Sequence, residues 1–378
     1  MNALAVVFWV SVALLLYAHG GYPLLLLAAA RAVGERPQAH TGATPSVSLI
    51  VAAHDEREVI AAKVADALAL DWPRAQLEVV VCCDGCRDDT AAVAGAAGAD
   101  LVLELPRSGK VRAQDAGVAA ARGELLAFSD ANASWEPDAL RELAAAFEDP
   151  AVGYACGQIR FVQAAAGAAA DNQEGLYWRY EMAVRAGESR LRSVTAGNGG
   201  IYAVRREAYL VVDERMGHDL SFPFNMVKRG WRAVYVPSAR ASEKMVPSID
   251  GEFTRKRRMM SHAWPIVLRG GMLSLRGYGL RYGWMILSHR VLRYAAPALH
   301  LVALASNIAL VGRGVVYQAC LAAQLALLLA AAAAARVRAR PFLLARYYVL
   351  MNASLAAGLW DYLRHGTPAG WEAPEGTR

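Results

Sequence analysis

The chain has few cysteines and no large surplus of one charge. It contains 5 cysteines in 378 residues, and its one CxxC, Cys83 and Cys86, has no second pair and no neighbouring histidine in the sequence. A single CxxC is weak evidence for a metal or redox site, so these cysteines are expected to be reduced packing residues at the end of a strand. The 40 basic and 34 acidic residues leave a net charge of +6. That modest excess is typical of the inner loops and lipid contacts of a membrane protein, and it does not indicate nucleic-acid binding.

The sequence also lacks an internal repeat and a basic residue before its first apolar run, residues 3–30. That run is too long for the apolar part of a cleaved signal peptide, so it predicts a transmembrane helix within residues 1–33. Hydrophobic residues make up 56% of the chain, above the roughly 45–50% of soluble proteins, and the excess lies at the two ends. Three later apolar segments predict about three transmembrane helices within residues 289–363: residues 295–311, 315–335 and 342–360.

Arginines predict the orientation of these helices. They follow the first span and separate the last two: Arg31 and Arg36, then Arg336, Arg338 and Arg340. The positive-inside rule places both groups in the cytoplasm, with the N-terminus and the tail, residues 364–378, outside. Residues 261–288 mix aromatic residues with arginines, which predicts an amphipathic segment in the membrane interface. We therefore expect a multi-pass protein of the cell (inner) membrane, in contact with membrane lipids, with residues 45–260 in the cytoplasm.

Residues 45–260 have the pattern of an α/β domain. Strands are expected over Val47–Ala53, residues 77–83, Leu101–Leu105 and residues 125–128, and helices over residues 59–70, 90–98 and 113–121. Continuously apolar strands separated by helices predict a mostly parallel sheet with both faces covered. Sheets of this kind bind ligands at the carboxyl ends of their strands.

Acidic residues follow three of the four expected strands. Asp55 and Glu56 come after the first, Asp84 ends the second, and Asp130 follows the fourth. A single acidic turn is ordinary, because aspartate caps helices and favours turns. Three of them at the edge where such sheets bind ligands indicate a functional site.

Several motifs, in their order and spacing, resemble those of the family 2 glycosyltransferases. They are Val-Ser-Leu-Ile-Val-Ala-Ala-His-Asp-Glu at residues 47–56, Asp84-Gly85, Gly109-Lys110, Ser-Asp-Ala-Asn at 129–132, Thr-Ala-Gly-Asn-Gly-Gly-Ile-Tyr-Ala-Val-Arg-Arg at 195–206, His218-Asp219 and Arg-Lys-Arg-Arg-Met at 255–259. The resemblance covers residues 47–264, and the flanking apolar segments resemble the polysaccharide-synthase branch. It implies the GT-A fold and an inverting transfer of sugar from a nucleotide-diphosphate sugar, first of all a UDP-sugar, to a lipid-linked or glycan acceptor.

The resemblance also implies donor-binding roles. Asp84 would accept hydrogen bonds from the base or ribose of the nucleotide, since a carboxylate only accepts. Asp55 and Glu56 would border the same pocket, where the family more often has Tyr-Asn-Glu. Lys110 would direct its charge at the diphosphate; the structural alternative is a solvated surface lysine.

A metal site is implied by Asp130 and Asn132, which match the acidic metal motif of the family. Their oxygen atoms suit Mg²⁺ or Mn²⁺, which would bridge the diphosphate and stabilise the leaving group. Asn132 replaces an acidic residue often found there, so a lower metal affinity is expected. The alternative for this pair is a turn closed by an asparagine.

Asp219 matches the general base of the family, which takes the proton of the acceptor hydroxyl during attack. His218 stands where the family usually has an acidic residue and is a second candidate for the base, and a helix cap is the structural alternative for Asp219. The glycine-rich loop with Gly197, Asn198 and Gly199 would line the acceptor site, although a plain tight turn explains it as well.

The basic run at residues 255–259 falls where synthases carry a Gln/Arg-x-x-Arg-Trp signature. Arg255 and Arg258 would bind the released diphosphate, and contact with anionic lipid is the alternative.

Three other functions were weighed. A processive synthase that threads its product through the membrane is disfavoured by the presence of only four apolar segments and by Met259 in place of tryptophan. A non-catalytic scaffold that binds nucleotide-sugar would not need Asp84, Asp130 and Asp219 together. A transporter is disfavoured because no acidic residue lies near the centre of an apolar segment.

Overall fold

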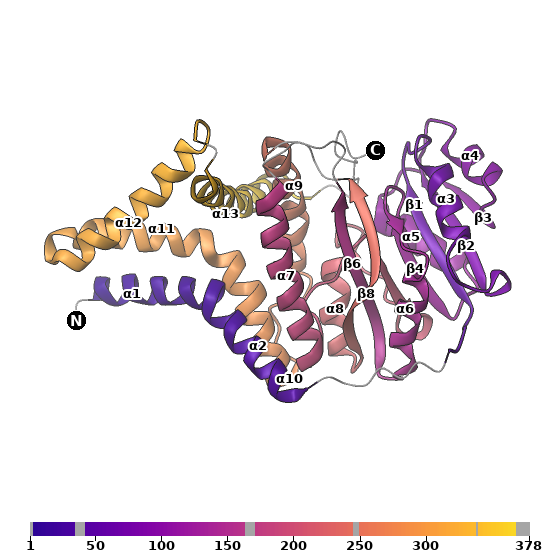
Figure 1. Cartoon of the computed structure of the whole chain (residues 1–378), viewed down its shortest axis with the longest axis horizontal. Helices are drawn as coiled ribbons and strands as arrows, with labels where there is room; N and C mark the ends of the chain where they lie inside the picture. The colour runs from indigo at the N-terminus through magenta and orange to yellow at the C-terminus, as the bar shows by residue number, and fades with distance from the viewer. Residues whose placement is uncertain (1–2, 35–41, 163–170, 245–248, 338, 368–378) are drawn as a thin grey trace.

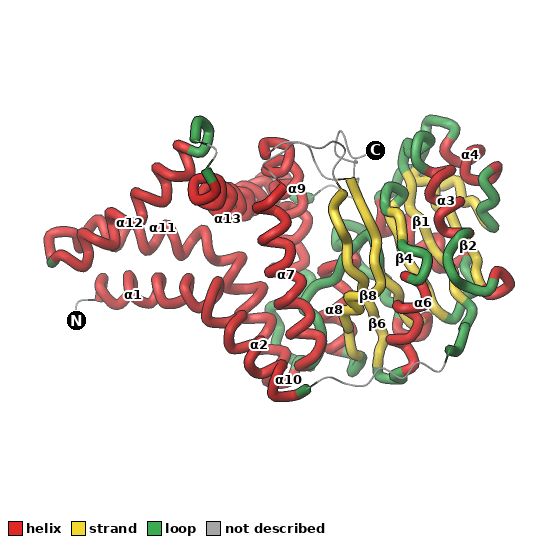
Figure 2. Tube along the Cα trace, viewed as in Figure 1, coloured by secondary structure: helices red, strands yellow, loops and turns green. Residues whose placement is uncertain are grey.

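The computed structural model describes residues 3–34, 42–162, 171–244, 249–337 and 339–367. A layered α/β domain occupies one end of the molecule and an all-helical part the other (Figure 1). Figure 2 shows that strands are confined to the α/β end. Arg36, Arg338 and the tail beyond residue 367, on which the predicted orientation partly depends, lie outside the described residues.

Within the described residues, eight strands form one mixed sheet in the order β3-β2-β1-β4-β7-β6-β8-β5. Its first half is parallel: β3 (Leu101–Leu105), β2 (Leu77–Asp84), β1 (Val47–Ala53) and β4 (Leu125–Asp130). In the second half, β7 (Tyr202–Arg205) runs antiparallel to both β4 and β6 (Val152–Val162), β8 (Arg232–Lys244) runs parallel to β6, and β5 (Ser134–Trp135) runs antiparallel to β8. The predicted bounds of β1 and β3 are confirmed, and β2 and β4 extend to the acidic residues Asp84 and Asp130.

Helices cover both faces of this sheet, which explains why its strands are continuously apolar. On one face Leu49 and Val51 pack with α3 (Ile60–Leu68), α4 (Thr90–Ala96) and α6 (Ala139–Ala145). On the other, Ile50 and Ala52 share a core with α5 (Lys110–Ala120), α7 (Asp171–Leu191) and α8 (His218–Lys228). Successive residues of β1 therefore meet different helices, as the two-residue period of a strand requires.

Among the described residues, four helical stretches are long and apolar enough to cross a membrane. The first joins α1 (Ala3–Leu16) to α2 (Tyr22–Val33) through a π-helical turn, and the second joins α10 (Gly279–Met285) to α11 (Leu292–Leu310) in the same way. The other two are α12 (Val315–Ala333) and α13 (Arg340–His365). Residues 279–288, at the end of the predicted interfacial segment, thus form the start of a helix long enough to cross a membrane, called a membrane-long helix below.

The helical part packs directly against the α/β domain. Tyr22 and Leu26 of α2 share a buried core with Val184 of α7 and Phe224 of α8. Helix α9 (Ile249–Leu268) lies against α13, where a β-carbon on Gly358 would be 2.7 Å from Met260 Cβ and 2.9 Å from the Arg257 carbonyl oxygen. Only glycine permits this close approach. The α/β domain and the candidate membrane helices therefore share continuous cores.

Candidate active site

The carboxyl ends of β1, β2 and β4 bring the predicted donor-binding residues to one edge of the sheet. Ala52 of β1 is in register with Asp130 of β4, and Ala53 with Cys83 of β2. The acidic ends of the three strands therefore lie side by side, as the sequence pattern predicts.

Asp84 is buried and its carboxylate organises the loop before α5. The carboxylate accepts hydrogen bonds from the backbone N–H groups of Ser108, at 2.6 Å, and Gly109, at 3.0 and 3.1 Å, and it pairs with the Arg107 guanidinium at 2.7 Å. Gly109 has a φ of 96°, a conformation that favours glycine, and α5 begins at the next residue. Asp84 thus fixes the position of Lys110 at the start of that helix; its contact with a nucleotide stays a prediction.

Asp55 adopts a φ of 51°, in the left-handed region, which places its carboxylate against Arg87. It accepts from the Arg87 backbone N–H at 2.7 Å and from the guanidinium at 2.6 and 3.1 Å. These bonds, first of all the one from the backbone, lower the pKa of Asp55 to about 2. Glu56 is buried, and its backbone N–H donates to Thr90 Oγ1 at 2.9 Å.

The fold also brings a histidine to the CxxC, which the sequence alone did not indicate. His54, Asp55 and Cys86 offer possible metal-ligand atoms within 4.8 Å of one another. All five cysteines are free thiols; of the CxxC pair, Cys83 is buried, in agreement with the expected packing role, whereas Cys86 is only partly buried.

Lys110 and Asp130 form an ion pair at the centre of the strand-end edge. Burial lowers the pKa of Lys110, but the Asp130 carboxylate, together with the charges of Asp219 and Glu243, outweighs that effect, so the net shift is upward and the ammonium stays charged. Gly199 lies beside the pair: a β-carbon built on it would be 3.9 Å from Lys110 Nζ and 4.0 Å from Asp219 Cβ. The glycine-rich loop, the lysine and the predicted base therefore converge on one place.

Asp219 lies in the first turn of α8, and the N-cap position belongs to Gly217. The helix-cap interpretation of Asp219 is therefore wrong. Burial raises the pKa of its carboxyl group, while Lys110 opposes the rise. Its backbone oxygen accepts from the Gly197 N–H at 2.6 Å, which ties the predicted base to the glycine-rich loop.

His218 lies in an aromatic enclosure. Its ring stacks on Phe222 with centroids 4.0 Å apart, and its Nδ1 is 2.8 Å from the Tyr202 hydroxyl. Burial, followed by the charge of Lys110, lowers the pKa of His218 to about 3. The side chain is therefore neutral at physiological pH.

Two glycines of the glycine-rich loop are in contacts that leave no room for a side chain. A β-carbon on Gly197 would be 1.8 Å from the Tyr154 hydroxyl, and one on Gly200 would be 2.2 Å from Glu243 Oε1. Asn198 is buried between them; it donates to the Gly157 carbonyl oxygen and accepts from Arg185. In this structure the Asn198 side chain fixes the loop to β6 and α7.

The basic run lies on α9. The Arg255 guanidinium is 5.7 Å from the centre of the Phe161 ring, and its charge acts on Glu243 at the end of β8. Arg257 instead forms an ion pair with Asp361 of α13 at 2.6 Å. The carbonyl oxygen of Arg258 accepts from Ser261 Oγ at 2.7 Å. Arg255 is thus on the side of α9 nearest the site.

Comparison with known proteins gives the family. The model described as "Glycosyltransferase like family 2" matches residues 45–261, more than half of the chain. The chain belongs to glycosyltransferase family 2. Among curated proteins it is similar to an N-acetylglucosaminyltransferase of Rhizobium leguminosarum bv. viciae, with 28% identity over 57% of this chain and 55% of that protein. An uncharacterized glycosyltransferase of Mycobacterium tuberculosis is 32% identical over 43% of this chain and 76% of its own length. The chain spans about half the length of the first of these relatives.

A solved structure confirms the fold of this glycosyltransferase. A mannosyltransferase of Pyrobaculum calidifontis, solved with GDP-Man and Mn²⁺, superposes over 95% of this chain and 99% of that chain, with a TM-score of 0.71 and 22% identity. At this identity the likeness establishes the fold alone. The predicted GT-A architecture with helices at both ends is therefore confirmed.

The residues present fit a divalent metal. Asp130, at the end of β4, provides a carboxylate, and Asn132, half-buried in the turn that follows, provides an amide oxygen. Hard oxygen donors of this kind are what Mg²⁺ and Mn²⁺ prefer.

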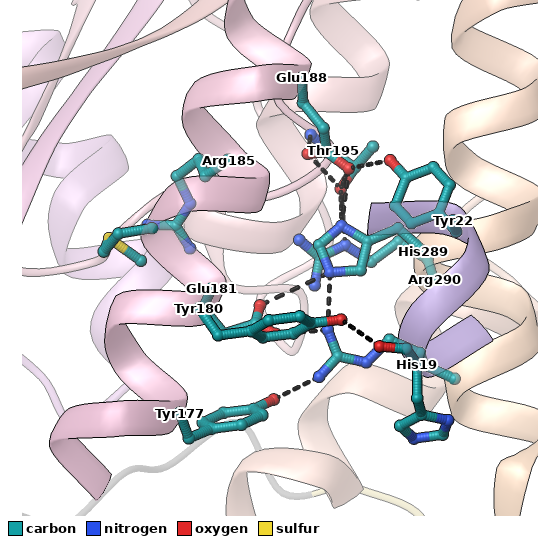
Figure 3. A network of polar contacts seen from close by, with 12 residues as sticks. His19, Tyr22, Tyr177, Tyr180, Glu181, Arg185, Glu188, Thr195, His289 and Arg290 are labelled. Carbon is teal, nitrogen blue, oxygen red and sulfur yellow. Dashed lines mark hydrogen bonds and ion pairs between the residues drawn. The ribbon is translucent and has the colours of Figure 1, made fainter. Parts of the chain in front are cut away.

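A buried polar network joins this glycosyltransferase domain to its membrane-long helices (Figure 3). Glu188 of α7 is its centre: it accepts from Tyr22 of α2 at 2.8 Å and from the Thr195 N–H at 2.9 Å, and it pairs with His289 at 2.6 Å. Arg290 donates to Thr195 Oγ1 at 2.8 Å. The sequence did not predict this network, because a glutamate on an amphipathic helix, such as Glu188, is usually expected to be exposed to solvent. The segment that leads into the glycine-rich loop is thereby anchored to two membrane-long helices.

Proposed function

We propose that this chain transfers a sugar with inversion from a nucleotide-diphosphate sugar, first of all a UDP-sugar, to a lipid-linked or glycan acceptor. One observation carries the proposal: Asp219, a carboxyl group with a raised pKa, lies across Gly199 from the Lys110–Asp130 pair. The proton acceptor and the cation proposed to bind the diphosphate are therefore close enough for one sugar to contact both. Four candidate spans among the described residues support action at a membrane surface.

In the proposed reaction Asp219 removes the proton of the acceptor hydroxyl while that oxygen attacks the anomeric carbon of the sugar. The new glycosidic bond forms as the bond from the anomeric carbon to the diphosphate breaks, and the configuration inverts. The proton moves to the Asp219 carboxylate, and the nucleoside diphosphate leaves. The raised pKa suits this role, because a stronger base accepts a proton more readily.

Lys110 binds the diphosphate with a point charge, and the loop fixed by Asp84 holds it in place. A divalent metal held by Asp130 and Asn132 supplies further charge stabilisation of the diphosphate when bound. Arg255 and Arg258 bind the diphosphate as it leaves. Asp55 and Glu56 border the nucleotide, and Gly197, Asn198 and Gly199 form the backbone wall of the acceptor site.

The acceptor is reached at the cytoplasmic face of the cell membrane. This orientation rests on the arginines that follow the first span and separate the last two. Single or limited transfer is proposed over processive synthesis, because few candidate spans lie among the described residues and Met259 departs from the processive signature.

The activity is tested with the full chain in detergent, incubated with a panel of nucleotide-sugars, Mn²⁺ and membrane-derived acceptor, by measuring nucleotide release. Asp219→Asn preserves size and removes the proton acceptor. Turnover should fall by about 10² to 10⁴, and the affinity for the donor should stay nearly unchanged.

His218→Gln is the companion variant, because the neutral, enclosed histidine is not expected to take the proton. Near-normal turnover of Asp219→Asn together with loss of activity in His218→Gln would assign the base to the histidine. If no nucleotide-sugar of the panel is consumed by the wild-type chain, the proposed function is wrong.

A further inference from the structure

Glu243, near the end of β8, has a carboxylate oxygen that the proposed reaction does not yet use. Its Oε1 is buried and has no hydrogen-bond partner in the part of the chain that the structure describes. A buried polar atom without a partner is costly, and in native proteins it commonly marks an unseen water or ion. No sequence motif indicated this residue.

The pairing of β5 with β8 places Glu243 beside the metal motif. Ser134 is opposite Ser242 and Trp135 is opposite Ala241 in this antiparallel pair, so the next position outward sets Glu243 opposite Ala133. Asn132 is the following residue on that side. The loop after β4 and the end of β8 therefore run next to each other at the site.

Gly200 makes the room for this carboxylate. The Gly200 carbonyl oxygen is held by Ser129 Oγ at 3.3 Å and Trp135 Nε1 at 3.0 Å. A β-carbon on Gly200 would lie 2.2 Å from Glu243 Oε1 and 3.5 Å from Ala133 Cβ. Any larger residue would displace the carboxylate from its position against the 130–133 turn.

The neighbouring cations do not explain the orphaned oxygen. The buried Lys63 donates to the Ala133 carbonyl oxygen at 2.7 Å and lies 3.4 Å from Asp66, and Lys110 pairs with Asp130. Both lysines, together with Arg255 and Asp130, act on Glu243 through their charges. The positive charges of the two lysines and Arg255 stabilise the neighbouring carboxylates. None of the described side chains, however, donates a hydrogen bond to Glu243 Oε1.

We propose that Glu243 supplies a third oxygen ligand to the divalent metal held by Asp130 and Asn132. The inference rests on the metal role in the proposed function. It also accounts for Asn132: an amide oxygen coordinates without charge, and a glutamate from β8 supplies the negative charge that a second acidic residue in the motif would have given. Two carboxylates and one amide oxygen make a hard oxygen set suited to Mg²⁺ or Mn²⁺.

Mn²⁺ binding to the full chain in detergent tests the inference without a turnover assay. Free Mn²⁺ is followed by electron paramagnetic resonance in a titration, once with Mn²⁺ alone and once with UDP added. Glu243→Gln keeps the size of the side chain and removes its charge, and it should weaken Mn²⁺ binding by about tenfold or more, the size of effect seen when groups that support a metal site are removed. Glu136→Gln is the matched control: it removes one carboxylate just after β5, at a position where Glu136 pairs with Arg160 at the surface, and should bind Mn²⁺ as the wild type does.

Asp130→Asn separates failure of the inference from failure of the proposed function. Weak Mn²⁺ binding in Asp130→Asn with wild-type binding in Glu243→Gln overturns the role of Glu243 and leaves the metal role standing. Wild-type chain that binds no Mn²⁺ under either condition overturns both. Circular dichroism checks that each variant is folded; should Glu243→Gln be misfolded, Glu243→Asp replaces it, and Mn²⁺ affinity unchanged by the shorter carboxylate counts against the inference.

Discussion

Removing the Glu188 carboxylate should destabilise the chain more than any surface substitution. Glu188 is fully buried and is bonded to Tyr22, to the backbone and hydroxyl of Thr195, and to His289. Glu188→Ala leaves these groups buried without their shared partner. Glu188 also faces the charge of Arg290. Removing one side of a buried charge pair costs about 3–5 kcal/mol, and we expect a loss of unfolding free energy in that range.

Glu188→Gln tests how much of this loss depends on charge. The amide fills the same space and keeps one of the two acceptor oxygens, so the charge and the hydrogen bonds accepted by the other oxygen are lost while the remaining bonds persist. Hydrogen bonds to charged groups contribute about 1.5–3 kcal/mol, and the loss in Glu188→Gln should therefore be smaller than in Glu188→Ala. Glu207→Ala is the control, because this glutamate is 69% exposed and lies 3.8 Å from its partner Arg205; exposed pairs are worth about 1 kcal/mol or less.

The assay is urea titration of the detergent-solubilised chain, followed by tryptophan fluorescence, with kinetics measured on the same preparations. Because Thr195 leads into the glycine-rich loop, Glu188→Gln should raise the KM for the acceptor more than the KM for the donor. The reasoning fails if Glu188→Ala unfolds at the same urea concentration as Glu207→Ala, or if the two KM values change equally.

Three further outcomes are expected. Excess chelator should abolish turnover and Mg²⁺ or Mn²⁺ should restore it; full activity in chelator would exclude the metal role of Asp130. The kcat/KM should rise with pH through a pKa above that of an ordinary aspartate, because burial and the like charge of Asp130 raise the pKa of Asp219 more than Lys110, the Leu220 backbone N–H and Arg185 lower it; the base must be deprotonated to act, so a limb at or below the ordinary value contradicts the assignment. A cysteine placed in the tail, outside the described residues, should react with an impermeant thiol reagent on intact cells, and labelling only after lysis would reverse the predicted orientation.

The parallel half of the sheet could be predicted because both of its faces are covered. Burial on two sides makes each strand a continuous apolar run, and the run ends where the chain reaches the ligand-binding edge. The start of α5 was less clear and lies at Lys110, earlier than the predicted residue 113. No Ser, Thr, Asp or Asn side chain caps this helix; the turn is made by Gly109, whose backbone is fixed by Asp84 from another strand.

The antiparallel half was not predicted from the sequence. Strand β8 carries two arginines, two serines and a glutamate over 13 residues, so it has neither a continuous apolar run nor a clean alternation. Several of these polar residues are in place because of tertiary contacts: Ser238 bonds Glu142 at 2.5 Å and Arg240 pairs with Glu136 at 3.5 Å. A strand that satisfies its polar groups through distant partners gives little local signal.

Both glutamates that the sequence analysis missed are placed by contacts between distant segments. Glu188 is buried because α2 and the π-helical turn before α11 (Ile286–Val291) close over α7, and its bonds reach 166 residues back to Tyr22 and 101 residues on to His289. Glu243 reaches the 130–133 turn because β8 pairs with β5 across more than 100 residues of chain. A sequence motif reveals functional residues that are close together in the chain and act at the same site, such as Asp130 and Asn132. A carboxylate that reaches the same site from another strand has no motif around it in the sequence. Only the register of the sheet and the burial of its oxygen distinguish such a residue from a solvated glutamate.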